Sequence, residues 1–430
     1  MNRTMTLKHI ILTSTVAAST LMSMACGGEV YDAVQQRWTT GDPDDAVCFS
    51  ATLSDAATRS SDAATRSESP VPAPGELTLA ALQDGTDGFG VYGVYTGMRR
   101  YVSSTVSPDF LCNQQVVWSA VLPQTEESWT YSPLKYWPNG EGEATGESQG
   151  EIPHYVSFFA YAPWSNLQTT GSSHQPANCI IDSSQPYDQG DPWLTYRLAE
   201  DPLTEQVDLL YALPLIDQTK PETAERLLFT FRHALGCVGN TVRLQCDADL
   251  QGRMRAKVNG TTVVRDELIL NSITVDYVLT SKGRLYLWNQ GEPNWHTITS
   301  ENVKTTRQVS WTDLDHIVYA YNGTNEDGTA WAGQGKGIFY IPIEGDDYVQ
   351  RATITVDYTL RTYSTYISEG NVGNVYTDHE NQVQAILILR EQRDGTTGES
   401  LYGPGLKMDF RLTLDDTSLF ISTTSFTTQW

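Results

Sequence analysis

The feature that most constrains this chain is a series of short segments in which apolar and polar residues alternate, separated by clusters of Gly, Asp, Asn and Pro. In the first segment Val47, Phe49, Ala51 and Leu53 alternate with Cys48 and hydroxyl residues. A period of two buries one face of a strand, and few stretches have the three-and-four spacing of a long helix. Short strands between frequent turns are typical of sandwiches and barrels, so we predict an all-β fold.

The same pattern predicts strands along the rest of the chain. They cover residues 76–82, 89–95, 115–122, 155–164, 207–215, 271–280, 284–288, 337–343, 352–360, 385–390, 407–414 and 419–430. A long strand over 227–246 changes phase at Gly239-Asn240, which indicates a bulge or a turn. A polar connector with Pro221 predicts a domain boundary, giving one β-sandwich domain over 46–222 and a second over 223–430.

The N-terminus has the pattern of an export signal. Arg3 and Lys8 precede a short apolar stretch, and Ser23-Met24-Ala25-Cys26 forms a small-residue site ending in Cys. The apolar stretch is too short to remain as a membrane span. We predict a lipoprotein signal peptide over 1–26, lipid on Cys26 and a polar tether over 27–45, with simple cleavage after Ala25 as the alternative.

A near-duplicate follows the first strand. The sequence Ser-Asp-Ala-Ala-Thr-Arg ends at Arg59 and again, after Ser60, at Arg66, and three prolines follow by Pro74. Small, polar and Pro-rich stretches form exposed loops, where proteolysis concentrates. The two arginines are therefore candidate cleavage sites, or incidental residues of a low-complexity linker.

The charge of the chain excludes one class of partner. Its formal net charge is -24 and its pI is about 4.5. Neutralising phosphates requires clustered Lys and Arg, so we expect neither nucleic acid nor an anionic membrane surface to be bound.

The sequence offers little support for catalysis. Ser148 lies in a Gly-x-Ser-x-Gly pattern, but the stretch before it is polar and glycine-rich, whereas a nucleophile elbow follows an apolar strand. The acidic clusters lack the spacing of a calcium loop, and the seven histidines lack metal-like pairing. We predict no enzyme activity, no catalytic or metal-ligating residues and no cofactor.

The cysteines allow disulfides in an exported protein. With Cys26 assigned to lipid and Cys48 set aside, four remain, and our prediction is one bridge per domain. The pairs are Cys112 with Cys179 and Cys237 with Cys246, and free buried thiols are the alternative.

Several of these features together resemble the fimbrillin family. The leader with Cys26 is followed by a first strand and a Thr-Arg loop, and the chain closes at Trp430. Between them lie the segments SFFAYAP at 157–163, DLLYA at 208–212 and FTFRHAL at 229–235. As an ordered series the features cover most of the chain.

The resemblance implies tandem transthyretin-like β-sandwich domains and a surface lipoprotein that builds adhesive pili on the outer membrane. It further implies a cut after Arg59 or Arg66, departure of the strand at 47–53, and filling of the vacated groove by the C-terminal strand of another subunit. The donor would lie in 419–430, where Phe420, Phe426 and Trp430 share one parity. Its partners would be other pilus subunits and the outer membrane through lipid, with a host protein or glycan as a further option.

Two other functions stay open at this stage. One is a pilus anchor or tip protein that does not polymerise, and the other is a surface lipoprotein that binds glycans on exposed Trp and Tyr rings. A contiguous exposed aromatic patch would favour the glycan alternative.

Overall fold

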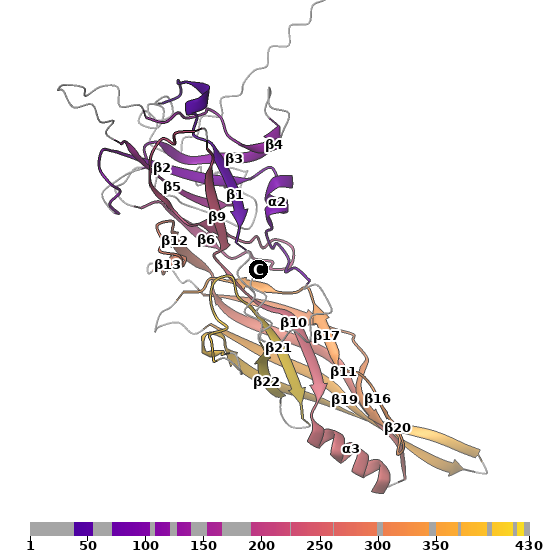
Figure 1. The fold of residues 1–430 in the computed structure, drawn as a ribbon. Coiled ribbons are helices and arrows are strands. Elements are labelled where there is room, and N and C mark those ends of the chain that lie inside the picture. Colours follow the sequence, from indigo (N-terminus) through magenta and orange to yellow (C-terminus); the bar gives the residue numbers. More distant parts are fainter. Residues whose placement is uncertain are drawn as a thin grey trace, which may run out of the picture.

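The computed structural model consists mainly of β-strands with few helices (Figure 1). It describes residues 38–54, 71–103, 108–120, 127–138, 153–165, 191–223, 225–260, 262–298, 304–343, 350–368, 371–393, 398–415 and 419–424. No helix in these ranges is long and apolar enough to cross a membrane.

The first sheet occupies one end of the molecule (Figure 1). Its described strands run in the order β1 (Phe49–Leu53), β9 (Leu227–His233), β7 (Leu210–Ala212), β5 (Tyr155–Ala162), β2 (Phe89–Gly97), β3 (Leu111–Ala120) and β4 (Glu127–Thr130), and β8 (Leu215–Gln218) pairs with β5. The sheet is buried on both faces, because Phe89 and Val91 of β2 belong to one hydrophobic cluster and Tyr92 and Val94 to another.

Two further sheets pack face to face at the other end of the molecule. One has the order β17 (Trp331–Gln334), β10 (Gly236–Cys246), β21 (Lys407–Leu414) and β22 (Leu419–Thr424), with β18 (Ile338–Tyr340) paired to β10. The other has the order β16 (Glu326–Asp327), β15 (His316–Tyr321), β11 (Val263–Thr280), β19 (Arg351–Ser368) and β20 (Asn371–Ile388), with β14 (Lys304–Trp311) paired to β11. Val242 and Leu412 of one sheet share a buried cluster with Val275 and Ile354 of the other, so these sheets form a sandwich.

A small sheet joins the two ends. It has the order β13 (Asn294–His296), β12 (Lys282–Tyr286) and β6 (Trp193–Arg197). It therefore combines strands from both halves of the sequence, and β9 of the first sheet also lies beyond residue 222. The predicted boundary at 222/223 does not divide the sheets, because long-range pairing and not the polar connector decides which strands belong together.

The helices differ from the sequence prediction. Residues 76–82 were expected to form a strand, but α2 (Leu79–Asp84) is a helix, capped by Thr78, whose Oγ1 accepts from the Ala81 amide at 3.1 Å. An N-cap followed by Leu-Ala-Ala-Leu favours helix. The other helix, α3 (Ala248–Gly260), buries Leu250, Met254 and Val258 at intervals of four, a signal that the strand pattern obscured. Short 3₁₀ turns are η1 (Pro43–Asp45) and η2 (Leu389–Glu391).

Of the bulge or turn predicted at Gly239-Asn240, the structure shows an irregularity within one strand. The register of β10 against β21 shifts between Val238 and Val242, and Gly239 has φ +72°. A left-handed backbone favours glycine, and a Cβ here would lie 2.2 Å from the Tyr277 hydroxyl. The long strand predicted over 227–246 is in fact two strands, β9 and β10, which lie in different sheets.

Candidate functional site

The first strand, β1, lies at the end of the first sheet. It pairs in parallel with β9, so that Phe49 faces Leu227, Ala51 faces Phe229 and Leu53 faces Phe231. Within the described residues no strand lies on its other side. Removing β1 would therefore expose the backbone edge of β9 without breaking any other ladder of this sheet.

The best-buried part of this segment is the start of β1 together with Val47, which lies just before it. Val47 and Phe49 are 0% and 1% exposed, whereas Ala51 and Leu53 are half-buried. The Phe49 ring lies 5.5 Å from the ring centroids of Phe229, Phe158 and Tyr131. The space that Phe49 occupies is thus a slot walled by aromatic rings.

Polar contacts fix the backbone around this slot. The Tyr131 hydroxyl donates to the Val47 carbonyl at 2.9 Å, and burial raises the pKa of Tyr131 well above its usual value, so it stays a neutral donor. One Arg226 guanidinium nitrogen donates to the carbonyls of Phe49 and Trp129, each at 3.3 Å. Tyr131 and Arg226 both follow the candidate cleavage sites in the chain. They would therefore remain after loss of β1 and could bind the backbone of another strand.

The candidate cleavage residues, Arg59 and Arg66, lie outside the described residues. The described chain stops at Ser54, whose amide donates to the Phe231 carbonyl at 2.9 Å, and resumes at Val71. A cut after either arginine would therefore separate β1 from the whole chain that follows Val71.

The chain that resumes there is held by both halves of the protein. We call residues 71–77 the strap. Asn240 Nδ2 donates to the Val71 carbonyl at 2.7 Å, and Gln206 Nε2 donates to the Pro74 carbonyl at 2.7 Å. Lys407 Nζ lies 2.8 Å from Glu76 Oε2 in a pair whose side chains are 5% and 11% exposed. Sequence reasoning missed the strap, although the Pro74-Gly75 turn marks its centre.

A buried carboxylate supports the strap from the first half of the chain. The Leu77 amide donates to Asp208 Oδ2 at 3.4 Å, and the Asp208 amide donates to the Gly75 carbonyl at 3.0 Å. His233 Nδ1 lies 2.6 Å from the same Asp208 oxygen, and both side chains are almost fully buried. His233 is therefore a packed core histidine. With these contacts the strap would stay in place after loss of β1.

Asp409, on β21, makes stability depend on pH. Burial raises its pKa to about 6, against the opposing effects of the Thr241 amide, which donates at 2.7 Å, and of Lys407 and Arg243. Between about pH 4 and pH 6 the unfolded chain ionises this carboxyl while the folded chain keeps it protonated, so stability falls by ~3 kcal/mol as the pH rises. Asp409→Asn should remove this pH-dependent change in the free energy of unfolding.

The measurement is denaturant unfolding of both proteins at about pH 4 and about pH 7. The variant should gain stability relative to the wild type as the pH rises through this window, because its amide keeps the bond from Thr241. If the two proteins differed in free energy of unfolding by the same amount at both pH values, the raised pKa of Asp409 would be contradicted.

The predicted donor strand lies in the second half. β22 pairs antiparallel with β21 at the end of its sheet, with Phe420 opposite Thr413. The structure describes the backbone of β22 but not its side chains, and Phe426 and Trp430 lie outside the described residues. The donor role of these three residues stays a prediction.

One of the predicted disulfides is wrong. Cys237 and Cys246 are free thiols on the same strand, β10, where nine residues of extended chain separate them by ~30 Å. Cys112 is buried, and its predicted partner Cys179 lies outside the described residues, as does the lipidation residue Cys26.

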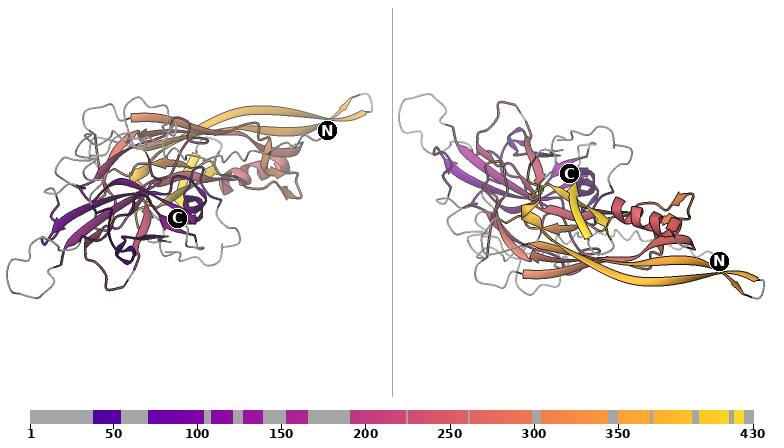
Figure 2. Two further views of the ribbon diagram at one scale, coloured as in Figure 1. Left: turned by 90° about the horizontal axis from the view of Figure 1, so that it is seen from above. Right: turned by 90° about the horizontal axis from the view of Figure 1, so that it is seen from below.

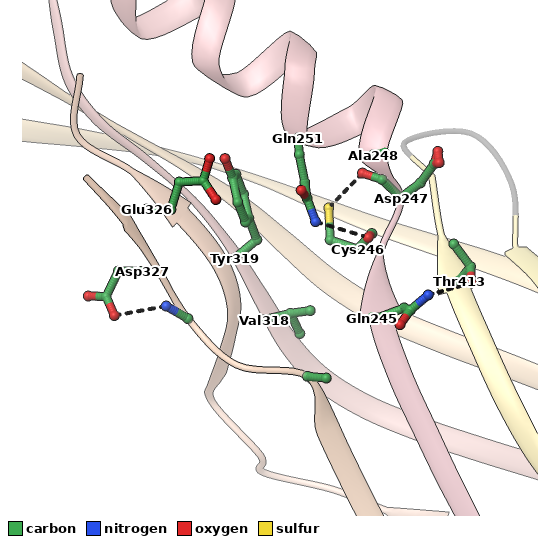
Figure 3. A pocket seen from close by; sticks show the side chains of 12 residues that line it. Gln245, Cys246, Asp247, Ala248, Gln251, Val318, Tyr319, Glu326, Asp327 and Thr413 are labelled. Atoms are coloured by element: carbon green, nitrogen blue, oxygen red, sulfur yellow. Dashed lines mark hydrogen bonds between the residues drawn. The ribbon is translucent and has the colours of Figure 1, made fainter. Parts of the chain in front are cut away.

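A pocket of about 600 Å³ opens beside the start of α3 (Figure 3). Two of its carboxylates are paired, Glu326 with Arg255 and Asp327 with Arg265. Burial, reinforced by nearby carboxylates, raises the pKa of the Cys246 thiol to about 12, so the pocket lacks an ionised thiol nucleophile. The described residues contain no cluster of three or more His, Cys, Asp or Glu placed to hold a metal, and Ser148 lies outside them.

The aromatic side chains mostly fill the cores. Among the described residues Tyr376 is the one aromatic side chain that is largely exposed, at 58%. A contiguous exposed aromatic patch, the feature that would favour glycan binding, is therefore absent from the described surface.

The comparisons with known proteins give remote similarities. No family model and no curated protein matches the sequence. Among solved structures, a protein from Bacteroides uniformis ATCC 8492 proposed to act in cell adhesion is 12% identical with a TM-score of 0.38, covering 89% of this chain and 98% of its own. The fimbrial anchor protein Mfa2 from Porphyromonas gingivalis is 12% identical with a TM-score of 0.24, covering 79% and 89% respectively.

Proposed function

We propose that this chain is a subunit of a cell-surface pilus that functions in adhesion and assembles by strand exchange. In this proposal the chain is exported as a lipoprotein through Cys26, reaches the outer membrane and is cut after Arg59 or Arg66. The strand β1 then leaves, and the C-terminal segment of another subunit takes its place. In this proposal the two ends of the molecule would be the tandem transthyretin-like β-sandwich domains that the sequence resemblance implies.

The observation that carries the proposal is the position of β1. It is a short edge strand, it is joined to the rest of the chain through the segment with both arginines, and its Phe49 fills an aromatic slot. An unpaired edge beside an apolar slot is a strong template for a strand of another chain, because main-chain bonds give affinity and alternate side chains set the register. Since the donor and the acceptor are different surfaces, the contact repeats head to tail.

Limited trypsin treatment of the full chain tests the proposal. We expect cleavage in 55–70, loss of β1 and conversion of monomers into ladders on a denaturant-free gel. The control is Arg59→Ala/Arg66→Ala, which should stay monomeric because neither bond can be cut. Ladders that form equally in the control, or a cut chain that stays monomeric with β1 removed, would contradict strand exchange.

The second candidate is an anchor or tip subunit. It differs from a stalk subunit in one respect, since it would keep β1 and the lipid on Cys26 in the finished assembly. An uncut, lipidated chain at the base of pili recovered from cells would favour it.

A further inference from the structure

Among the described residues the longest strand pair is the hairpin of β19 and β20, each of 18 residues. Its tip projects past α3, away from the first sheet (Figures 1 and 2). The strand β20 is the last strand of its sheet among the described residues, and although β22 approaches it, β22 is hydrogen-bonded to β21. Within the part of the chain that the structure describes, no strand is hydrogen-bonded to this long backbone edge of β20, and such an edge can pair with another strand.

Exposed apolar side chains gather on this edge strand. Val375, Tyr376 and Ile386 are 52%, 58% and 63% exposed, and they belong to the few large apolar side chains that the described surface exposes. Tyr376 and Ile386 point to the same, outer face as Gln384, because all three have even numbers and Gln384 bonds Thr355 on that face. Val383 and Leu387, with odd numbers, are buried in the sandwich.

The charges on β20 restrict what can lie beside it. Its outer face also carries Asp378, held by Arg361 at 2.7 and 2.9 Å, and Glu380. Charged side chains on an edge strand disfavour its pairing with most other strands. A suitable partner strand must therefore place amides or cations opposite Asp378 and Glu380, and apolar residues opposite Tyr376 and Ile386.

We propose that the partner is a second copy of this chain, with the two β20 strands antiparallel about a two-fold axis at Asn381. In this register Tyr376 faces Ile386 of the second copy, Asp378 faces Gln384, and Glu380 faces Gln382. The apolar residues meet, each carboxylate meets an amide, and Asn381 meets its own copy. The interface is isologous and closes as a dimer, so it is distinct from the head-to-tail contact of the proposed pilus.

Neighbouring registers are worse. Moving the axis to Glu380 places two copies of this carboxylate opposite each other, and like charges directly opposite are destabilising. Moving it to Gln382 places Asp378 opposite Ile386, which desolvates a charge against an apolar side chain. The strand therefore favours one register of self-pairing.

Disulfide trapping tests the register. In the full chain Asn381→Cys should form an intermolecular disulfide under mild oxidation, because directly opposite Cα atoms are about 4.5–5.5 Å apart. In the matched control Thr377→Cys, residue 377 lies opposite Ala385 of the second copy. The two copies of residue 377 are then ~27 Å apart, so this variant should stay uncrosslinked. The wild type gives the background from its own cysteines.

Two variants of opposite charge at residue 384, compared by sedimentation, test the stability of the dimer. Gln384→Lys should tighten the dimer and Gln384→Glu should loosen it, each by roughly 2- to 30-fold in dissociation constant, since two cross-strand pairs change per dimer. Both substitutions are at an exposed position, and equal melting temperatures of the monomers would show that the fold is unaffected.

Cross-linking at residue 381 but not 377, together with opposite shifts for Lys and Glu, is the expected result. A monomer at every concentration, cross-linking at 377, or a dimer insensitive to residue 384 would overturn the proposal. If deleting residues 425–430 from a monomeric chain produced the dimer, the edge would belong to the chain's own C-terminal segment.

Discussion

Replacing Lys407 with Met should lower the free energy of unfolding by about 3–5 kcal/mol, because it leaves the Glu76 carboxylate buried without its partner. Lys407 Nζ and Glu76 Oε2 are 2.8 Å apart and both side chains are largely shielded from water. The change also frees the strap from β21, so the loss should be accompanied by faster amide exchange over 71–77. Denaturant unfolding and hydrogen exchange measure the two effects.

Two further variants control this experiment. In Glu76→Gln/Lys407→Met no unpaired charge remains, so most of the loss should be recovered. Lys220, whose side chain is 47% exposed, pairs with Asp45 at 2.6 Å, and Lys220→Met should cost less than about 1 kcal/mol. A loss at Lys407 no larger than the loss at Lys220 would show that the strap is not held by this pair.

Phe49→Ala should destabilise the protein by about 3–5 kcal/mol, since it empties a slot walled by three aromatic rings. Because β1 is an edge strand, the loss should be local, raising amide exchange in β1 and along β9 while the sandwich of β10 and β11 stays protected. Trypsin should also convert this variant to ladders faster than the wild type, because β1 leaves more readily.

Leu228 supplies the matched control for Phe49. It lies opposite Ser50 in the same ladder and is 51% exposed, so Leu228→Ala should change stability by less than about 0.5 kcal/mol. Uniformly faster exchange throughout the protein in Phe49→Ala would show that β1 is integral to one cooperative core and not a separable strand.

The sequence predicts the local parts of this site well. The alternation of Val47, Phe49, Ala51 and Leu53 predicts a strand over 47–53, and β1 forms within it because a period of two leaves Phe49 on the buried face. The Pro74-Gly75 turn was not predicted, although it too is local: Gly75 has φ +72°, and a Cβ there would clash with the Gln206 carbonyl oxygen. Such features depend on residues that are adjacent in the chain.

The predictions that failed concern contacts between residues far apart in the chain. Nothing near β1 indicates that its partner is β9, and the assignment of β9 and β10 to different sheets is decided by their long-range neighbours. Lys407 and Asp409 share the parity that alternation assigns to the solvent face of β21, yet both are buried, because Glu76 and the Thr241 amide provide them with partners. The predicted bridge between Cys237 and Cys246 rests on the expectation of one disulfide per domain, and it fails because both residues lie on one extended strand.

The most direct test of the central claim is N-terminal sequencing with intact mass of the chain recovered from the native cell surface. Strand exchange predicts a chain that starts at Ser60 or Ser67 and therefore lacks Phe49 and the lipid on Cys26. A lipidated chain that starts at Cys26 and retains β1 in the assembled pilus would contradict it.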